Sequence, residues 1–370
     1  MRYRDAIIEE GKTLDDSGTL TRDMDIVDPV SAIELEFHAT NYSDGNADNF
    51  ISDVITKIEI VDGSDVLYSV NLSELEALHF YKTGKTPVLF PSEWLSGGQR
   101  HACLLLFGRK LWDPEYAMDF TRFRNPQLKI TSNLAAIRSV GSLGFTTATL
   151  VCNITAKVME DMPAKPSKYL MSKEVITWTS GTSGDKRIDL PRDYVYRMLM
   201  ARLWVEGSDI DEVVTDLKLT CDTDKFILFD HDLSRLDEDA FMRFGRCMLK
   251  HDVHRAGSCT IRCLCNKEPD MTVYCQDPSN PQQFVKWAQW SSTINLEIYN
   301  GSGSLDGTAR DQTGIESGHA LHATLPIPFG EMDDPETWFD PTRYGKVEWV
   351  GTEDVAAACA LVLEQVRPLP

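Results

Sequence analysis

The sequence carries one succession of segments twice, and this internal repeat limits the fold more than any other feature. Residues 54–60 resemble a strand and lead to a helix-like segment at 72–84, and residues 213–219 lead in the same way to 233–245. The copies are 159 residues apart at the strand (213 minus 54) and 161 apart at the helix (233 minus 72). A two-residue insertion between them accounts for the difference. Matched segments in a fixed order indicate a duplicated domain.

A second match lies further along each copy. Residues 113–123 and 334–344 both read D-P-E-x-x-x-D-x-T-R followed by an aromatic residue, 221 positions apart (334 minus 113). Asp before Pro suits a helix start, because Asp caps free backbone N–H groups and Pro fits the first helical position. We therefore expect each motif to begin a short helical turn, with the second Asp capping again and the Arg reaching back to a carboxylate of its own motif.

We interpret this motif as structural, because catalysis needs one working copy whereas a duplicated fold element needs both. The residues concerned are Asp113, Pro114, Glu115, Asp119 and Arg122 in the first copy and Asp334, Pro335, Glu336, Asp340 and Arg343 in the second.

Strand patterns dominate the rest of the chain. Residues 33–37 alternate apolar and acidic side chains, and apolar side chains share one face of 148–158, which is the period of a half-buried strand. The clearest helix is expected to begin at Ser73, with Glu76 completing a capping box. We predict an all-β chain in which residues 30–158 and 190–367 form separate β-sandwiches that match strand for strand.

The domain boundary is expected where two prolines interrupt the strand patterns, at 161–168. This gives a first domain at 1–162, with an N-terminal arm, and a second at 163–370. The spacing between copies grows from 161 to 221, so the second domain holds about 60 additional residues (221 minus 161), an insertion at about 246–328. We predict long exposed loops there, above all at 301–318, which is rich in Gly, Ser, Thr and Asp.

Composition excludes several classes of function. A net charge of -20 argues against direct sequence-specific binding of nucleic acid, which depends on clustered Lys and Arg. No apolar run approaches the roughly 20 residues that cross a bilayer, and no apolar signal segment is apparent, so we expect a soluble protein assembled in a host cytoplasm. Nine cysteines without a disulfide-type spacing favour reduced thiols. We expect no cofactor.

One group of residues has the chemistry of a metal site. Cys259, Cys263, Cys265 and the nearby His254 are zinc ligand types. Thiols spread along one strand face rarely converge on a tetrahedral ion, and buried Cys packs as a small hydrophobic residue. Core packing is therefore the favoured interpretation, with zinc as the alternative.

Other candidate sites have simpler explanations. Residues 180–186 are rich in Gly and Ser but lack the Gly-Lys-Ser/Thr order of a phosphate-binding loop, so we predict a hairpin turn. The aspartates between 222 and 239 do not follow the calcium-loop spacing and indicate a solvated acidic surface. His319 and His322 have no nucleophile motif nearby. We expect no catalytic residue and no enzymatic activity.

Two stretches of the first half carry a resemblance to a known family. Residues 58–64 lead into the helix near Ser73, and residues 104–109 lead into Asp113-Pro114-Glu115 and then 125–128. These stretches, and the plan of the whole chain, resemble the double jelly-roll major capsid proteins of tailless icosahedral, membrane-containing bacteriophages.

The resemblance implies two tandem jelly-roll β-sandwiches with short helices, and long loops in the second. It implies a homotrimeric capsomer of pseudo-hexagonal outline, in which six jelly rolls stand upright and the inserted loops form towers outside. The expected partners are further copies of the chain, neighbouring capsomers, minor capsid or penton proteins and an internal membrane, and the expected location is the virion.

Two other functions stay open. A carbohydrate-binding β-sandwich protein would use tryptophans as stacking platforms, with Trp287 and Trp290 as the favoured pair among eight. Duplication of the entire domain argues against it. A viral spike or minor vertex protein would share the virion but occur in fewer copies.

Overall fold

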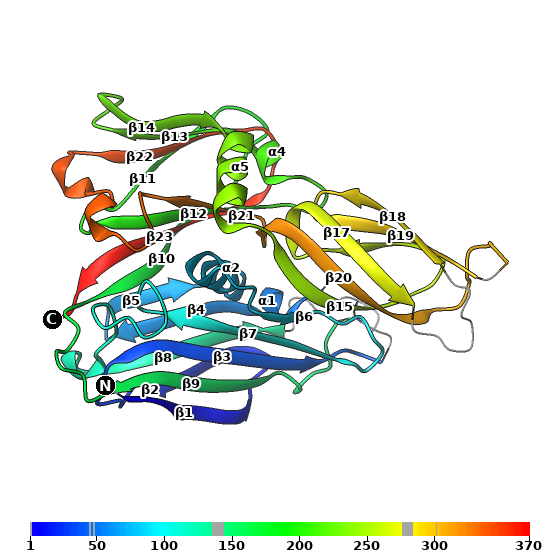
Figure 1. Ribbon diagram of the computed structural model, residues 1–370, viewed down its shortest axis with the longest axis horizontal. Coiled ribbons are helices and arrows are strands. Elements are labelled where there is room, and N and C mark those ends of the chain that lie inside the picture. Colours follow the sequence, from blue (N-terminus) through cyan, green and yellow to red (C-terminus); the bar gives the residue numbers. More distant parts are fainter. Residues whose placement is uncertain (1, 44–45, 47–48, 135–143, 276–283, 301) are drawn as a thin grey trace.

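The computed structural model describes residues 2–43, 46, 49–134, 144–275, 284–300 and 302–370. In the first half, two antiparallel groups of strands face each other across an apolar core (Figure 1). One is β1 (Arg2–Thr13), β9 (Val151–Glu160), β3 (Val30–Thr40), β7 (Gly98–Leu106) and β6 (Val88–Phe90); the other is β2 (Ser17–Asp23), β8 (Pro126–Asn133), β4 (Ile55–Asp62) and β5 (Asp65–Val70).

The second half repeats this order of strands. One group is β10 (Lys168–Thr179), β23 (Ala358–Pro368), β12 (Tyr196–Trp204) and β21 (Thr324–Pro328); the other is β11 (Asp185–Asp189), β22 (Val347–Glu353), β13 (Val214–Cys221) and β14 (Phe226–Asp232). The registers also correspond. Ala32 of β3 pairs with Leu106 of β7, and the equivalent residues of the second half, Met198 of β12 and Pro328 of β21, pair in the same way. The predicted duplication is confirmed for eight strands of each half, while β6 has no counterpart among these second-half strands. The expected starts at residues 30 and 190 were wrong, because β1, β2, β10 and β11 precede them and belong to the sheets.

The strand expected at 148–158 is β9, which begins three residues later. Its buried side chains, Cys152, Ile154 and Ala156 among them, alternate with half-buried polar ones, as the sequence period requires. Ala148 has a φ of 58°, a left-handed conformation that ends the extended run. The face of the strand was therefore predicted and its start was not.

Among the described residues, each half also has two α-helices between equivalent strands. These are α1 (Ile51–Val54) and α2 (Leu72–Thr83) in the first half, and α4 (Ile210–Val213) and α5 (Leu233–Phe244) in the second. The capping box expected from Ser73 and Glu76 was wrong. Asn71 caps α2 by accepting from the Glu74 backbone N–H at 2.9 Å, and the Glu74 carboxylate accepts from the Asn71 N–H at 3.0 Å.

The insertion is folded, which corrects the prediction of long loops. It comprises two three-stranded sheets, of β15 (Cys247–Arg255), β20 (Arg310–Leu321) and β17 (Cys265–Cys275), and of β16 (Ser258–Arg262), β19 (Thr293–Tyr299) and β18 (Phe284–Trp290). Val253, Ile261, Met271 and Leu296 belong to a core of their own. The unit projects from one end of the molecule (Figure 1). Within the described part of the glycine-rich segment, residues 302–309 are a mostly exposed connection.

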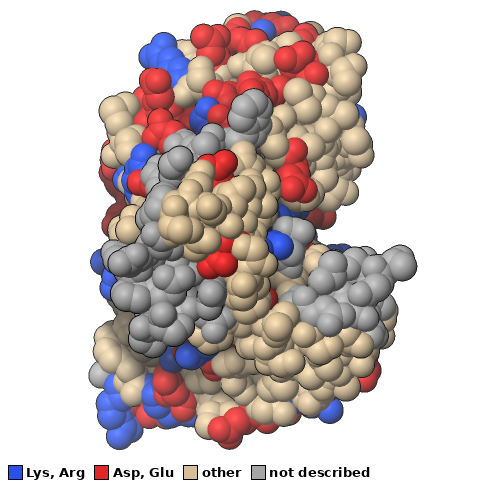
Figure 2. Space-filling model, turned by 90° about the vertical axis from the view of Figure 1, so that its right-hand side faces the viewer, with Lys and Arg blue, Asp and Glu red and all other residues tan. Residues whose placement is uncertain are grey.

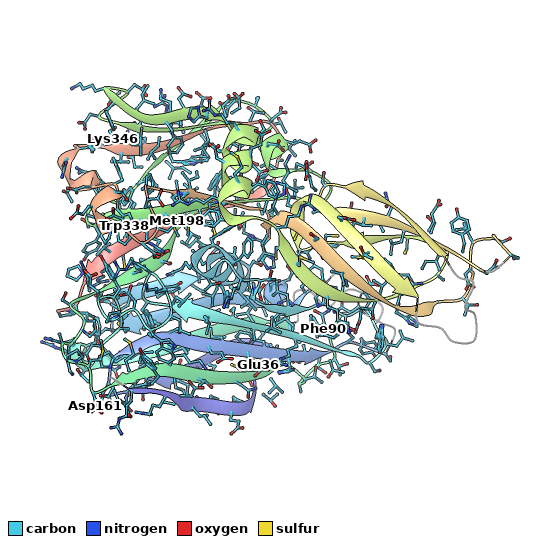
Figure 3. All side chains as sticks on the ribbon, in the orientation of Figure 1. Glu36, Phe90, Asp161, Met198, Trp338 and Lys346 are labelled. Atoms are coloured by element: carbon cyan, nitrogen blue, oxygen red, sulfur yellow. The ribbon has the colours of Figure 1, made fainter. Side chains whose placement is uncertain are left out.

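The halves are less separate than expected, because one sheet continues through both. Strand β10 pairs with β23 on one side and, in parallel, with β5 on the other, where Lys173 lies opposite Ser69. Met198, labelled between the halves in Figure 3, and Val362 join the apolar core of the first half. The segment 180–184 connects β10 to β11 in different sheets, so the predicted hairpin was wrong.

Candidate assembly surfaces

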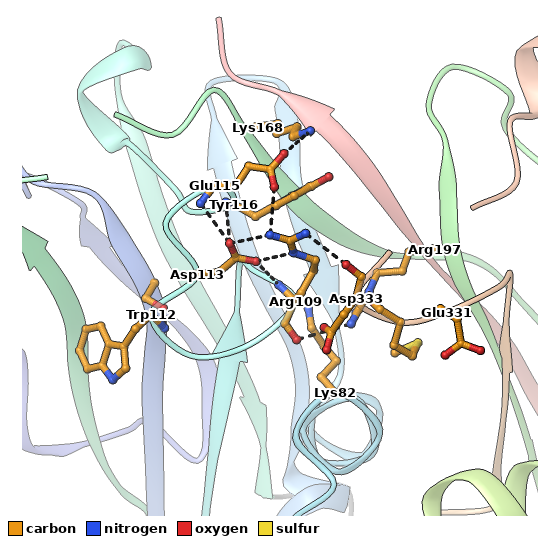
Figure 4. A network of polar contacts seen from close by, with 12 residues as sticks. Lys82, Arg109, Trp112, Asp113, Glu115, Tyr116, Lys168, Arg197, Glu331 and Asp333 are labelled. Atoms are coloured by element: carbon orange, nitrogen blue, oxygen red, sulfur yellow. Dashed lines mark hydrogen bonds and ion pairs between the residues drawn. The ribbon is translucent and has the colours of Figure 1, made fainter. Parts of the chain in front are cut away.

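The first copy of the repeated motif is built around a buried carboxylate (Figure 4). The Arg109 guanidinium donates to Asp113 at 2.7 and 3.0 Å, and the backbone N–H of Glu115 donates to it at 3.0 Å. Burial raises the pKa of Asp113, but the hydrogen bonds, those from Arg109 first, hold it below its ordinary value. Glu115 pairs with Arg109 at 3.0 Å and with Lys168 at 2.9 Å. No helical turn follows Pro114, which corrects the prediction for this copy.

The second copy has the expected turn. Asp334 caps the 3-10 helix Pro335–Thr337 by accepting from the Glu336 N–H at 3.1 Å, and Glu336 itself lies on the surface. The leading aspartates of the two copies have different partners. In the first half Arg109, directly after Phe107-Gly108, binds Asp113. In the second half the equivalent position holds Glu331, an acid that cannot donate to Asp334 in this way.

The second half of each motif is the same in both copies. Asp119 caps the 3-10 helix Phe120–Arg122, and Asp340 caps Pro341–Arg343. Arg122 lies 3.7 Å from the Asp119 carboxylate, and Arg343 lies 3.0 Å from that of Asp340. Each Arg therefore reaches back within its own motif, as the sequence analysis expected.

We expect the two leading aspartates to differ in their contribution to stability. Asp334→Ala should reduce the free energy of unfolding by about 1 kcal/mol, the usual loss for a helix cap. Asp113→Ala should cost about 2 to 3 kcal/mol, because the half-buried Arg109 loses a charged hydrogen-bond partner. Urea unfolding of both variants measures the difference. Equal losses would show that the environment of Asp113 adds nothing to the cap.

The interface between the halves contains buried charges. Glu364 of β23 lies 2.8 Å from Arg197 of β12 and 3.0 Å from Lys82 of α2, and all three side chains are at most 1% exposed. Burial raises the pKa of Glu364, and the attraction of Lys82 and Arg197 more than offsets this and lowers it. A buried carboxylate of one half thus neutralises a lysine of the other.

A second buried carboxylate, Glu76 of α2, contacts two histidines. His101 Nδ1 of β7 lies 2.8 Å from it, and His322 Nε2 of the second half lies 2.6 Å from its other oxygen. Burial raises the pKa of Glu76, but attraction by His101 and the hydrogen bonds to both histidines outweigh burial and lower it to about 2.

This contact predicts a loss of stability in acid. Glu76 titrates near 4.5 when unfolded and near 2 when folded, so its contribution is complete above pH 4.5 and is lost as the pH falls toward 2. The difference corresponds to about 3 kcal/mol. Measured between pH 5 and 2, the unfolding free energy of Glu76→Gln should fall less steeply than that of the wild-type chain. Parallel curves would contradict the prediction.

Equivalent helices of the two halves differ in exposure. Tyr81 of α2 is 5% exposed and donates to the Thr324 carbonyl oxygen at 2.9 Å, whereas its counterpart in α5, Met242, is 76% exposed. Phe80 is 2% exposed and its counterpart Phe241 is 37% exposed. The second half of the chain covers α2, and no equivalent domain covers α5 in the part of the chain that the structure describes.

The zinc candidates lie on different elements. Cys263 is buried in the core of the insertion with Cys259 packed beside it, while Cys265 begins β17 and is buried in the core of the first half. His254 lies in β15. Among the described residues, no group of three or more His, Cys, Asp or Glu side chains is arranged to hold a metal ion.

The other candidates are also placed. In the acidic run, Asp222 accepts from the Gly345 N–H at 2.7 Å, and Asp237 is buried 2.9 Å from His319. The run is therefore partly structural and not wholly a solvated surface. The side chains of Trp287 and Trp290 lie outside the described residues.

Figure 2 shows the end at which the insertion projects, where acidic side chains gather over the upper part. None of the helices in the described ranges has the length and apolar character needed to cross a membrane.

Two jelly rolls in tandem, with equivalent strands, helices and registers, define the chain as a double jelly-roll protein. Its structure is similar to the major capsid protein of Sulfolobus Turreted Icosahedral Virus, with a TM-score of 0.62 and 10% identity over 100% of this chain and 98% of that one. It is similar also to the major capsid protein of bacteriophage PM2, with a TM-score of 0.56 and 9% identity over 100% and 98%. No family model and no curated protein matches the sequence.

Proposed function

We propose that the chain is a major capsid protein that assembles as a homotrimer of pseudo-hexagonal outline and builds an icosahedral shell. The observation that carries this proposal is the duplicated jelly roll, shared over nearly the full length with two capsid proteins. Three chains would supply six similar wall units. A role of this kind requires neither a catalytic residue nor a cofactor.

The exposed face of α5 supports assembly. A partner placed against α5 as the second half is placed against α2 would cover Phe241 and Met242, which are large apolar side chains left open in the single chain. Exposed apolar surface of this kind is typical of sites that contact another protein.

The proposed domains are 1–162 and 163–370, divided in the connection between β9 and β10. The insertion would face the virion exterior, because a unit present in only one repeat is tolerated where it does not obstruct packing of the wall. Neighbouring capsomers, minor capsid or penton proteins and an internal membrane are the proposed partners, and the host cytoplasm is the proposed place of assembly.

Mass in solution tests the proposal. Light scattering of the purified protein should give three times the chain mass of 41.7 kDa, and negative-stain microscopy should show particles of hexagonal outline. Met242→Glu should shift the population toward the single chain. A protein that stays monomeric at all concentrations and forms no shell would contradict the proposal.

A further inference from the structure

We propose that the N-terminal strand β1 of one copy pairs beside β14 of the next copy. There it would close a groove that is lined in part by β14. This inference rests on the proposed homotrimer and names the contact that joins its chains. The groove has a volume of about 400 Å³ and lies in the second half, lined by Phe229, Phe329, Phe339, Asp340 and Tyr344.

The equivalent place in the first half is already filled. The spacing between the copies identifies the counterparts of the groove residues. It is 161 residues for Tyr68, 222 for Phe107, and 221 for Met118, Asp119 and Phe123. The chain that fills the place is the connection between the halves and the start of β10.

Backbone hydrogen bonds attach β10 there. The Leu170 N–H donates to the Phe107 carbonyl oxygen at 2.7 Å, and the Ala117 N–H donates to the Lys168 carbonyl oxygen at 3.2 Å. The Tyr169 ring lies 6.5 Å from that of Phe107. Further along, Lys173 pairs with Ser69 of β5 in parallel. The first half thus accepts a strand from the second.

Strand β1 is the counterpart of β10 in register as well as in order. β1 lies beside β9, where Arg2 pairs with Glu160, and β10 lies beside β23, where Tyr169 pairs with Arg367. Equivalent residues of β9 and β23 are 207 positions apart along both strands (367 minus 160), so these two pairs correspond. Both strands have a bulge at the same point, between Ile7 and Glu9 in β1 and between Glu174 and Ile176 in β10. Tyr3 therefore corresponds to Leu170 and Ala6 to Lys173.

Both strands to be joined are open in the single chain. β1 and β14 are outermost strands of their sheets, and Figure 1 places them at opposite sides of the molecule, so they meet only between copies. Tyr3 and Ile7 are 51% and 67% exposed, and Phe226 and Ile227 of β14 are 42% and 43% exposed.

The equivalent strand β5 shows what a partner does to such residues. Leu67 and Tyr68 of β5 are fully buried, whereas Leu228 and Phe229 of β14 are only partly buried. A head-to-tail contact of this kind closes into a ring when its rotation permits.

Cysteine pairs test the register. The counterpart of the Lys173 and Ser69 pair is Ala6 of one copy and Asp230 of the next. Neighbouring strands are about 5 Å apart, a Cα separation that a disulfide spans. The double variant Ala6→Cys/Asp230→Cys, oxidised or treated with a short bis-maleimide, should give covalent dimers and trimers on a non-reducing gel.

Three controls are matched to this variant. The wild-type chain reports on its own nine cysteines, and each single variant should stay uncross-linked. Thr13→Cys/Asp230→Cys places the thiol at the far end of β1 and should also give no ladder. Light scattering is recorded on every sample.

Two outcomes would overturn the β1 contact and leave the proposed function standing. In the first, the trimer forms normally but no double variant cross-links. In the second, the Ala6→Cys/Asp230→Cys and Thr13→Cys/Asp230→Cys variants cross-link to the same extent. A double variant and wild-type chain that are both monomeric would overturn both. Cross-linking confined to the Ala6 and Asp230 pair supports the contact.

Discussion

Glu364→Ala should reduce the free energy of unfolding by about 3 to 5 kcal/mol, the usual effect of removing one partner from a buried ion pair. The loss is large because Arg197, at most 1% exposed, would keep a buried charge without a carboxylate. Burial already lowers the pKa of Lys82 to about 8, so the loss of Glu364 would favour its neutral form. Chemical denaturation followed by fluorescence measures the change, and we expect it to affect both halves together because Glu364 lies between them.

The matched control is Arg343→Ala, which breaks a pair with Asp340 at 3.0 Å whose Arg side chain is 76% exposed. Exposed pairs contribute about 0 to 1 kcal/mol, so this variant should stay near the wild type. Similar losses in the two variants would mean that burial of the Glu364 cluster has no energetic consequence.

Exchanging two core residues between the repeats should produce a strong coupling. Leu128 and Ile130 of β8 occupy the positions that Trp349 and Gly351 occupy in β22. The strand pairing shows this correspondence. In the first half Ile60 pairs with Leu128 and Ile58 with Ile130, and the equivalent residues of the second half pair Leu219 with Trp349 and Leu217 with Gly351. A Cβ on Gly351 would lie 2.3 Å from the Trp349 ring. The second half thus combines a large and an absent side chain where the first half has two of intermediate size.

Trp349→Leu should destabilise the chain through the cavity it leaves, by less than the about 3 to 5 kcal/mol of a truncation to Ala. Gly351→Ile should cost about 1 to 3 kcal/mol through overpacking. The double variant restores the pair found in the first half and should lose less than the sum. Unfolding free energies of the two single variants and the double variant give the coupling, expected at about 1 to 3 kcal/mol. Strictly additive losses would contradict the volume exchange.

The duplication was predictable because it left residues in order along the chain. The strands at 54–60 and 213–219, the helices that follow, and the caps at Asp119 and Asp340 all lie where the repeat indicated. Local chemistry determines these features, so the sequence contained enough information to place them.

The insertion and the contacts between the halves were not predictable in the same way. A change in spacing reveals how many residues are added but not their conformation, so strands β15 to β20 were expected to be loops. Glu364, Arg197 and Lys82 meet from segments more than 100 residues apart, and no local pattern marks their pairing. The one local signal was an acid, Glu364, directly after the apolar run 358–363 in β23.

The covering of α2 by the second half has a consequence for synthesis. The first half ends at Glu160, but the residues that cover α2 and pair with Lys82 extend to Glu364, about 200 residues later (364 minus 160). At ribosomal rates of about 5 to 20 residues per second, that interval lasts on the order of 10 to 40 seconds. Until the last of these residues emerges, the apolar face of α2 is incompletely covered, so we expect the half-made polypeptide to be prone to aggregation.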